Sequence, residues 1–166
     1  MNPLEILLLA RKMATGSPLL VEKPDFSPRC ATDAEFDALV TAYYKLLYEE
    51  LSRDVAFLKS GRKMPRVKKA QRLLYILRTA AQHSGNKDVV REARKWRSGN
   101  SSPQSAANSL ASTMSAAFEE LASVAVYVSK SNSDSARWRK DLSVDTNIVF
   151  AGVVSDLGLC FSPNKQ

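Results

Sequence analysis

The sequence places its only histidine close to an arginine, and such a pair can act on a phosphate. Arg78 precedes His83 by five residues, and a Ser-Gly-Asn sequence follows the histidine. An imidazole with an ordinary pKa exchanges protons near neutral pH, and a guanidinium holds two phosphate oxygens without titrating. The pair therefore points to chemistry on RNA, whose own 2′-hydroxyl can serve as the nucleophile once a base removes its proton.

The pair lies in the most basic stretch of the chain. Residues 62–97 hold 12 of the 24 lysines and arginines but only 2 of the 17 acids, so their local charge is +10 against +7 for the whole chain. Two interpretations stay open: a phosphate-binding surface, or a face of charges in solvent. Under the first, the side chains expected to bind RNA are Arg62, Arg66, Lys68, Lys69, Arg72, Arg91, Arg94 and Lys95.

Other kinds of active site lack the residues that they need. Cys30 and Cys160 lie far apart, and no cysteine or histidine cluster surrounds either of them, so neither a zinc site nor a disulfide framework is indicated. The sequence contains no glycine-rich phosphate loop and no second histidine. We therefore expect no metal and no cofactor.

The chain is expected to be cytoplasmic and to have no membrane segment. An apolar run at residues 7–10 follows Glu5 and precedes Arg11 and Lys12, which is the reverse of a secretory signal. No run approaches the roughly 20 apolar residues of a membrane span.

The first third of the chain predicts two helices joined by a connector. Residues from about 3 form a short amphipathic helix that Gly16 ends, and residues 16–31 contain three prolines, which favours an extended connector or a flexible arm. Thr32 and Glu35 match a capping box, and an apolar stripe then continues through residue 60 as one long helix. Tyr44 and Tyr48 flank this stripe, a position that favours packing over base stacking.

The remainder of the chain predicts three further helices and an apolar tail. Helices are expected over about residues 66–83 and 88–96, and from Pro103 to about residue 128, followed by a Ser-rich polar link over residues 129–140. The tail fits a helix over about residues 145–157, with a strand as the alternative. The chain is thus expected to be an all-α bundle of about five to six helices, divided into residues 1–31, 32–130 and 131–166.

A motif of this kind at the end of a helix, inside an all-α bundle, resembles the HEPN domain. That family is marked by an Arg-x4-6-His motif, here Arg78-x4-His83, and the resemblance covers residues 33–130. It implies a metal-independent endoribonuclease that acts as a homodimer, with Arg78 and His83 as catalytic residues. Many members serve in toxin–antitoxin or antiviral defence systems, which implies an antitoxin or regulatory protein as a partner. Other members are inactive binding modules.

The resemblance also suggests an auxiliary acid on the preceding long helix, Glu50 or Asp54. Because a separation of five residues places two side chains about 140° apart on a helix, Arg78 and His83 converge only at an unwound helix end or across two subunits. One histidine serves poorly as both base and acid, so we expect a homodimer that brings two copies of His83 together, lined by Arg78 and rimmed by Arg72 and Lys69. The alternative is a non-catalytic helical module that binds RNA or regulates a partner.

Overall fold

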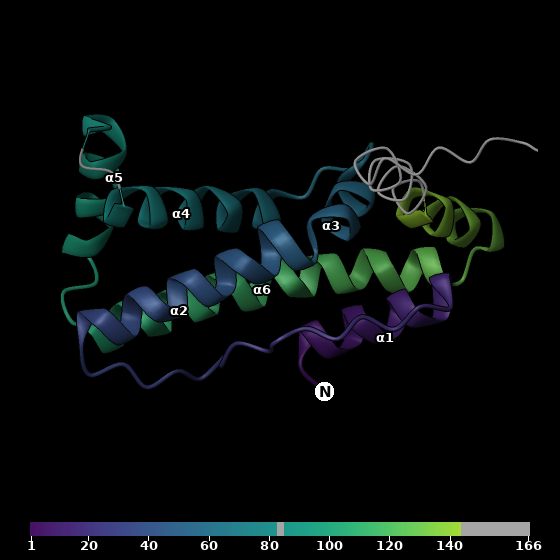
Figure 1. Cartoon of the computed structure of the whole chain (residues 1–166), viewed down its shortest axis with the longest axis horizontal. Coiled ribbons are helices and arrows are strands. Elements are labelled where there is room, and N and C mark those ends of the chain that lie inside the picture. Colours follow the sequence, from purple (N-terminus) through teal and green to yellow (C-terminus); the bar gives the residue numbers. More distant parts are fainter. Residues whose placement is uncertain (83–84, 144–166) are drawn as a thin grey trace, which may run out of the picture.

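The computed structural model describes residues 1–82 and 85–143, and over these residues the chain is all-helical (Figure 1). Its elements are α1 (Pro3–Thr15), α2 (Asp33–Lys45), the π-helical segment η1 (Leu46–Glu50), α3 (Ser52–Lys59), α4 (Pro65–Gln82), α5 (Lys87–Ser98) and α6 (Pro103–Ser129). Residues 132–143 are helical as well. The all-α class is confirmed. The bundle has more helical segments than expected because one predicted helix is divided and one predicted link is helical.

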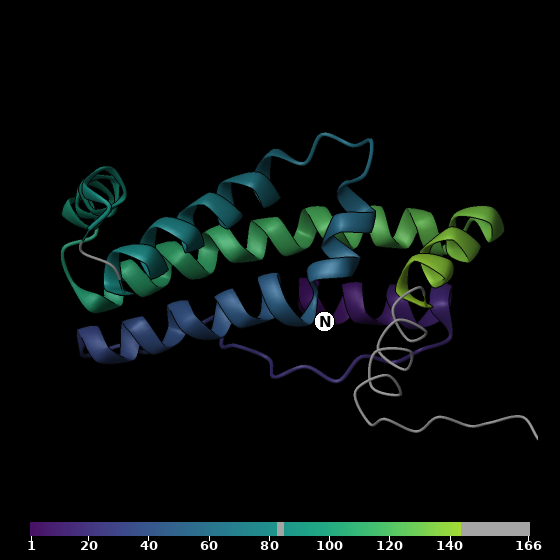
Figure 2. The ribbon, with the colours of Figure 1, turned by 45° about the horizontal axis from the view of Figure 1, so that its top comes forward.

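Helix α6 is the central element of the bundle. The hydroxyl of Ser102 accepts a hydrogen bond from the backbone N–H of Ser105 at 3.1 Å, and a proline occupies the first turn, so the helix begins where the sequence predicts. Its stripe of Leu110, Met114 and Phe118 is fully buried. The helix runs along the molecule and packs against α1, α2 and α4 (Figure 2).

Helix α1 belongs to the same hydrophobic core as residues 32–130. The side chain of Asn2 accepts from the N–H of Glu5, whose carboxylate accepts from the N–H of Asn2 in return, and this capping box fixes the start of the helix. Gly16, with a φ of +75°, ends it in the left-handed conformation. Leu4 and Leu7 are fully buried, and α1 packs along α6.

The connector over residues 16–31 is attached to the core by Phe26. Its ring makes edge-to-face contacts with Tyr43 and with Phe118, both at 5.7 Å between ring centroids. The hydroxyl of Tyr43 also donates to the backbone carbonyl of Asp25 at 2.9 Å. Cys30, near the end of the connector, is buried. These contacts favour the extended connector over the flexible arm.

The single helix predicted from Thr32 to residue 60 is wrong in one respect, since the structure divides it at η1. The capping box is confirmed: Thr32 Oγ1 accepts from the N–H of Glu35 at 3.2 Å, and a carboxylate oxygen of Glu35 accepts from the N–H of Thr32 at 3.0 Å. The N–H of Leu51 then donates to the carbonyl of Leu46, five residues earlier, at 2.9 Å. This wide turn rotates the side chains after it about the helix axis. The spacing of apolar residues alone does not predict such a turn.

Helices α4 and α5 form where the sequence predicts them. Their predicted apolar positions are buried or half-buried, with Val67, Leu74 and Val89 among the buried ones. Ala81 is an exception, because it is exposed in the last turn of α4, where it lines a surface cleft instead of the core. Helix α4 therefore turns its apolar side to α6 and α2, and α5 packs mainly on α4.

The polar link predicted over residues 129–140 is also wrong, because residues 132–143 form a helix. Trp138 is fully buried, and its ring stacks on Phe57 of α3 at 5.5 Å with an interplanar angle of 7°. A single large aromatic side chain packs this helix against the core. The serines and charged residues around it form no apolar period, so the sequence pattern did not predict a helix. The helix predicted over residues 145–157 lies outside the described residues.

Replacing Trp138 tests whether this last helix is part of the core. Trp138→Ala should lower the free energy of unfolding by about 3–5 kcal/mol, because a large buried ring is lost. Trp138→Phe should cost about 1–3 kcal/mol, because stacking on Phe57 remains while the hydrogen bond from the indole N–H to the Asp54 carboxylate is lost. Urea unfolding measures both, and Tyr127→Ala, at a side chain that is 70% exposed, is the control. A wild-type unfolding midpoint for Trp138→Ala would contradict the assignment.

Candidate functional site

Helix α4 carries the basic residues nearest to the motif, and its amphipathic pattern turns them outward. Burial of its apolar side against α2 and α6 leaves the opposite side in solvent. Lys68, Arg72 and Tyr75 are exposed, and their spacing of four and three residues aligns them along the helix. We call these three residues the basic strip.

Several arginines of the basic stretch have acid partners, which the sequence did not indicate. Their ion pairs are Arg66 with Glu119 at 3.4 Å, Arg91 with Asp88 at 2.8 Å, Arg97 with Asp33 at 2.6 Å, and Arg72 with Glu92. Glu119 and Asp33 come from α6 and α2, outside residues 62–97, so folding brings additional negative charge to the stretch. The field at the surface is therefore weaker than a local charge of +10 suggests.

Arg78 lies in the last turns of α4 in a different environment. Its guanidinium carbon lies 4.3 Å from the ring centroid of Tyr44, which itself stacks on Tyr48 at 4.6 Å. The hydroxyl of Tyr48 donates to the backbone carbonyl of Gln71 at 2.9 Å, so both rings are held against α4. Within residues 1–82 and 85–143, Arg78 forms no ion pair with a carboxylate. Arg78 is half-buried, and because a cation–π contact uses the face of the guanidinium, this contact leaves the in-plane N–H groups unused.

His83 and Ser84 lie outside the described residues. Helix α4 ends at Gln82, and the side chain of Asn86 accepts from the N–H of Val89 to cap α5. Arg78 therefore occupies the last turns of the helix that ends immediately before His83.

A cleft of about 360 Å³ opens between α2, α4 and α5 near this helix end. Arg94 and Arg97 line it, but so do Asp33 and Asp37. Burial, and next the nearby Asp33, raise the pKa of the Asp37 carboxyl, while Arg97 opposes that change. Two carboxylates disfavour a phosphate in this cleft, so the outer side of α4 is the better place for an anion.

The other predicted RNA-binding residues are spread over several faces. Lys69 and Arg66 line a separate cleft of about 550 Å³ against α6, so Lys69 does not share the side of α4 on which Arg72 lies. Arg62 donates to the carbonyls of Leu58 and Ser60 near the start of α4. Arg94 and Lys95 are exposed on α5. The structure thus places Lys68 and Arg72 on the exposed side of α4 and Arg78, half-buried against Tyr44, on the same helix, but it does not bring the whole predicted set together.

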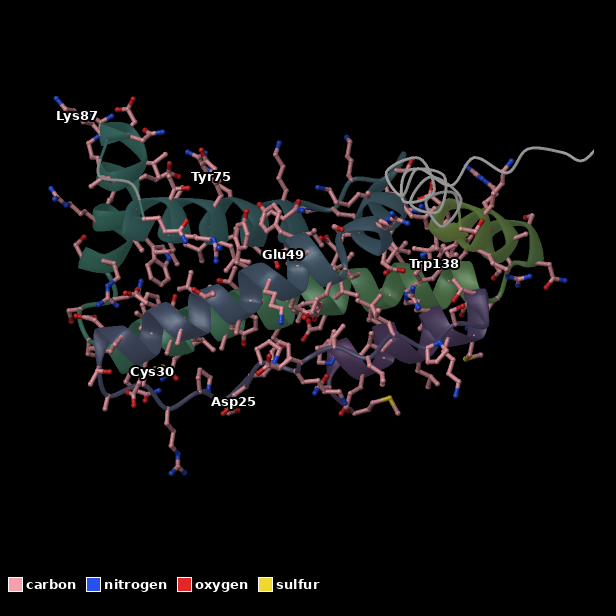
Figure 3. The ribbon with its side chains drawn as sticks, viewed as in Figure 1. Asp25, Cys30, Glu49, Tyr75, Lys87 and Trp138 are labelled. Atoms are coloured by element: carbon pink, nitrogen blue, oxygen red, sulfur yellow. The ribbon has the colours of Figure 1, made fainter. Side chains whose placement is uncertain are left out.

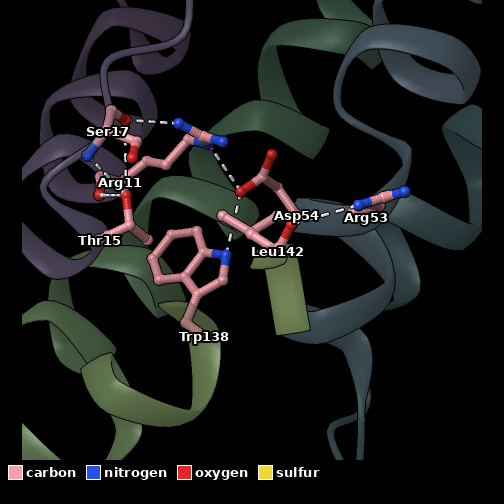
Figure 4. A network of polar contacts seen from close by, with 7 residues as sticks. All are labelled: Arg11, Thr15, Ser17, Arg53, Asp54, Trp138 and Leu142. Carbon is pink, nitrogen blue, oxygen red and sulfur yellow. Dashed lines mark hydrogen bonds and ion pairs between the residues drawn. The ribbon is translucent and has the colours of Figure 1, made fainter. Parts of the chain in front are cut away.

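Asp54, one of the two predicted auxiliary acids, takes part in a buried network at the other end of the bundle (Figure 4). Its Oδ1 accepts from Arg11 Nε at 2.9 Å and from Trp138 Nε1 at 3.0 Å, and the residue is only 2% exposed. Burial raises the pKa of this carboxyl, and the Arg11 ion pair opposes part of that rise. Figure 3 shows Lys87 at the left end of the molecule and Trp138 in its right half, so Asp54, which binds Trp138, lies away from the end of α4.

Glu50, the other predicted auxiliary acid, lies in the π-helical segment. Its Oε1 is 3.4 Å from Lys45 Nζ, and its Oε2 is buried without a hydrogen-bond partner among the residues that the structure describes. No hydrogen bond or ion pair connects it to Arg78 within the same residues. The geometry therefore gives Arg78 no acidic helper in the described part of the chain.

Tyr75 is a surface residue that sequence reasoning missed. Its side chain is 41% exposed, and the guanidinium carbon of Arg72 lies 5.7 Å from its ring centroid. The signal was present in the sequence, because Tyr75 is seven residues after Lys68 and three after Arg72 and therefore falls on the charged side of the helix.

The described residues contain no group of three or more His, Cys, Asp or Glu side chains that could hold a metal ion. No helix among them is long and apolar enough to cross a membrane. No protein-family model, curated protein or solved structure matches this chain.

Replacing Asp54 tests its structural role in the buried network. Asp54→Asn should lower the free energy of unfolding by about 3–5 kcal/mol, because it leaves the buried charge of Arg11 without a carboxylate. The double variant Arg11→Met with Asp54→Leu should recover much of that loss, since it removes both buried charges. Denaturant unfolding compares the three proteins. An Asp54→Asn protein as stable as the wild type would contradict the structural role.

Proposed function

We propose that this protein binds RNA along α4 and cleaves it at Arg78 and His83 without a metal ion, as an endoribonuclease of the HEPN type. The observation that carries the proposal is the environment of Arg78. Its guanidinium is held by Tyr44, has no carboxylate partner among the described residues, and lies in the last turns before His83. An arginine that is fixed in place and uncompensated is a binding site for an anion.

The chemistry follows from the two side chains. Arg78 would hold the non-bridging oxygens of the scissile phosphate and stabilise the negative charge of the phosphorane. A neutral His83 would take the proton of the 2′-hydroxyl, whose oxygen then forms a bond to phosphorus as the bond to the 5′-oxygen breaks. A protonated His83 from a second copy of the chain would protonate that leaving oxygen. The products are a 2′,3′-cyclic phosphate and a 5′-hydroxyl.

Exposed cations on α4 and α5 supply the binding energy in this proposal. Lys68 on the basic strip and Lys95 on α5 have no carboxylate partner in the described part of the chain, so they remain available for phosphates. Phosphate contacts of this kind weaken as the salt concentration rises, because bound counterions are released on binding. Within this proposal the protein works in the cytoplasm as a toxin or antiviral defence effector, under the control of an antitoxin or regulatory protein.

A second function, a non-catalytic module that binds RNA or regulates a partner, is favoured by one observation. Asp54 is occupied by Arg11 and Trp138, and among the described residues no hydrogen bond or ion pair joins Glu50 to Arg78, so neither expected acid is bonded to the arginine of the motif. Under this alternative, binding depends on the basic strip and survives loss of His83.

Cleavage of RNA in the presence of EDTA separates the two functions. His83→Ala and Arg78→Ala should each lower the cleavage rate at least about 100-fold, since each removes a group needed for proton transfer or charge stabilisation. Arg137→Ala is the matched control, because Arg137 is exposed and pairs with Asp134 in the helix over residues 132–143. Cleavage that requires a divalent metal, or that His83→Ala leaves unchanged, would sink the nuclease proposal.

The proposed site needs two subunits, so assembly is a separate prediction. We expect a homodimer whose α4 ends face each other, and short RNA should strengthen it because clustered guanidinium groups repel until an anion neutralises them. Light scattering at low and moderate salt, with and without a non-cleavable RNA, measures this. A monomer under every condition would leave the two catalytic roles of His83 without a second copy.

A further inference from the structure

Tyr75 is an exposed aromatic side chain in the middle of the basic surface. The other large apolar side chains that are exposed in the described residues are Met1, Leu9, Met13, Leu20 and Tyr127, and all of these lie outside residues 62–97. Exposure of one aromatic residue is ordinary on a protein surface. Its position between cations is the feature that needs an explanation.

The ring of Tyr75 is contacted by Arg72 and remains exposed to solvent. Arg72 lies against it at 5.7 Å from the ring centroid, and Arg72 is itself bound to Glu92 of α5. The hydroxyls of Tyr43 and Tyr48 each donate to a backbone carbonyl, whereas the Tyr75 hydroxyl has no such partner among the residues that the structure describes. Tyr75 thus lacks the hydrogen bond that fixes the two packing tyrosines, and 41% of its side chain stays open to solvent.

Tyr75 and Arg78 are neighbours on the surface of α4. A separation of three residues corresponds to about 4.5 Å along the helix axis and brings the two side chains onto adjacent positions. A phosphate bound at Arg78 therefore has the base of its own or the next nucleotide within reach of the Tyr75 ring. Lys68 and Arg72 continue along the helix in the direction of the flanking phosphates.

We propose that Tyr75 stacks on an unpaired base of the RNA whose phosphate Arg78 holds, so that the site takes single-stranded RNA in preference to duplex. This inference rests on the proposed function, because it assumes that RNA lies along α4. In a duplex, each base is stacked between its neighbours and offers no free face to a side chain, whereas a single strand can turn a base onto an aromatic ring. Lys68 and Arg72 without the Tyr75 ring would bind both forms through their phosphates.

Binding of a short single-stranded RNA and of its duplex to the full-length chain tests the inference. His83→Ala is used as the background so that the RNA stays intact, and a 2-aminopurine in the single strand reports stacking as a loss of fluorescence. The single strand should bind more tightly than the duplex. Tyr75→Ala should weaken binding of the single strand about 5- to 100-fold, the range for one base–aromatic stack, and abolish the quenching.

Three further variants locate the cause of any loss. Tyr75→Phe should restore the affinity and the quenching, because it keeps the aromatic face. Tyr75→Leu should not restore them, because it keeps the apolar contact alone. Tyr127→Ala is the matched control, a tyrosine that is 70% exposed on α6. Circular dichroism spectra of all variants check that each protein is folded.

The possible failures are distinguishable. Equal affinity for the two forms of RNA, with no effect of Tyr75→Ala, overturns the stacking inference and leaves RNA binding by α4 intact. If Lys68→Ala weakens binding of both forms equally while Tyr75→Ala does not, the surface is correct and the ring has no part in it. An absence of RNA binding at any salt concentration overturns both the inference and the proposed function.

Discussion

Burial of the apolar surface of α6 is the constraint on which the rest of the structure depends. Leu110, Met114 and Phe118 have no exposed surface, and α1, α2 and α4 each pack against this helix. Burying such side chains stabilises the fold by roughly 1.5–3 kcal/mol each. Each of the three surrounding helices therefore turns its apolar side to α6, and this sets its orientation about its own axis. For α4 the consequence is direct: once Val67 and Leu74 face the core, Lys68, Arg72 and Tyr75 must face solvent.

The elements with a strong apolar period were predictable from sequence, and those fixed by one contact were not. The boundaries of α6 and the Thr32 capping box followed from local patterns that depend only on neighbouring residues. The division of the second helix at η1 did not, because a π turn keeps the apolar residues buried while changing their phase. The helix over residues 132–143 did not either, since one tryptophan on Phe57 outweighs a polar composition.

The helix that carries Arg78 was predictable, and the ion pairs around it were not. The apolar period predicted a helix over about residues 66–83, and α4 spans Pro65–Gln82 in the described residues. The sequence did not indicate which cations would be neutralised, because the partners of Arg66 and Arg97 come from α6 and α2, 53 and 64 residues away along the chain. Long-range pairing of this kind depends on the tertiary fold, so a count of charges in one segment overstates the field that a polyanion meets.

Two arginines show how the fold assigns different roles to one kind of side chain. Arg11 is buried against the Asp54 carboxylate, also donates to the carbonyl of Ser17 at 2.5 Å, and thereby joins α1 to α3. Its charge is fully engaged, and a ligand could reach it only by unfolding part of the core. Arg78 rests on the face of Tyr44, which positions the guanidinium without neutralising it. An aromatic partner therefore differs from a carboxylate partner, because it contacts the guanidinium while leaving its positive charge uncompensated.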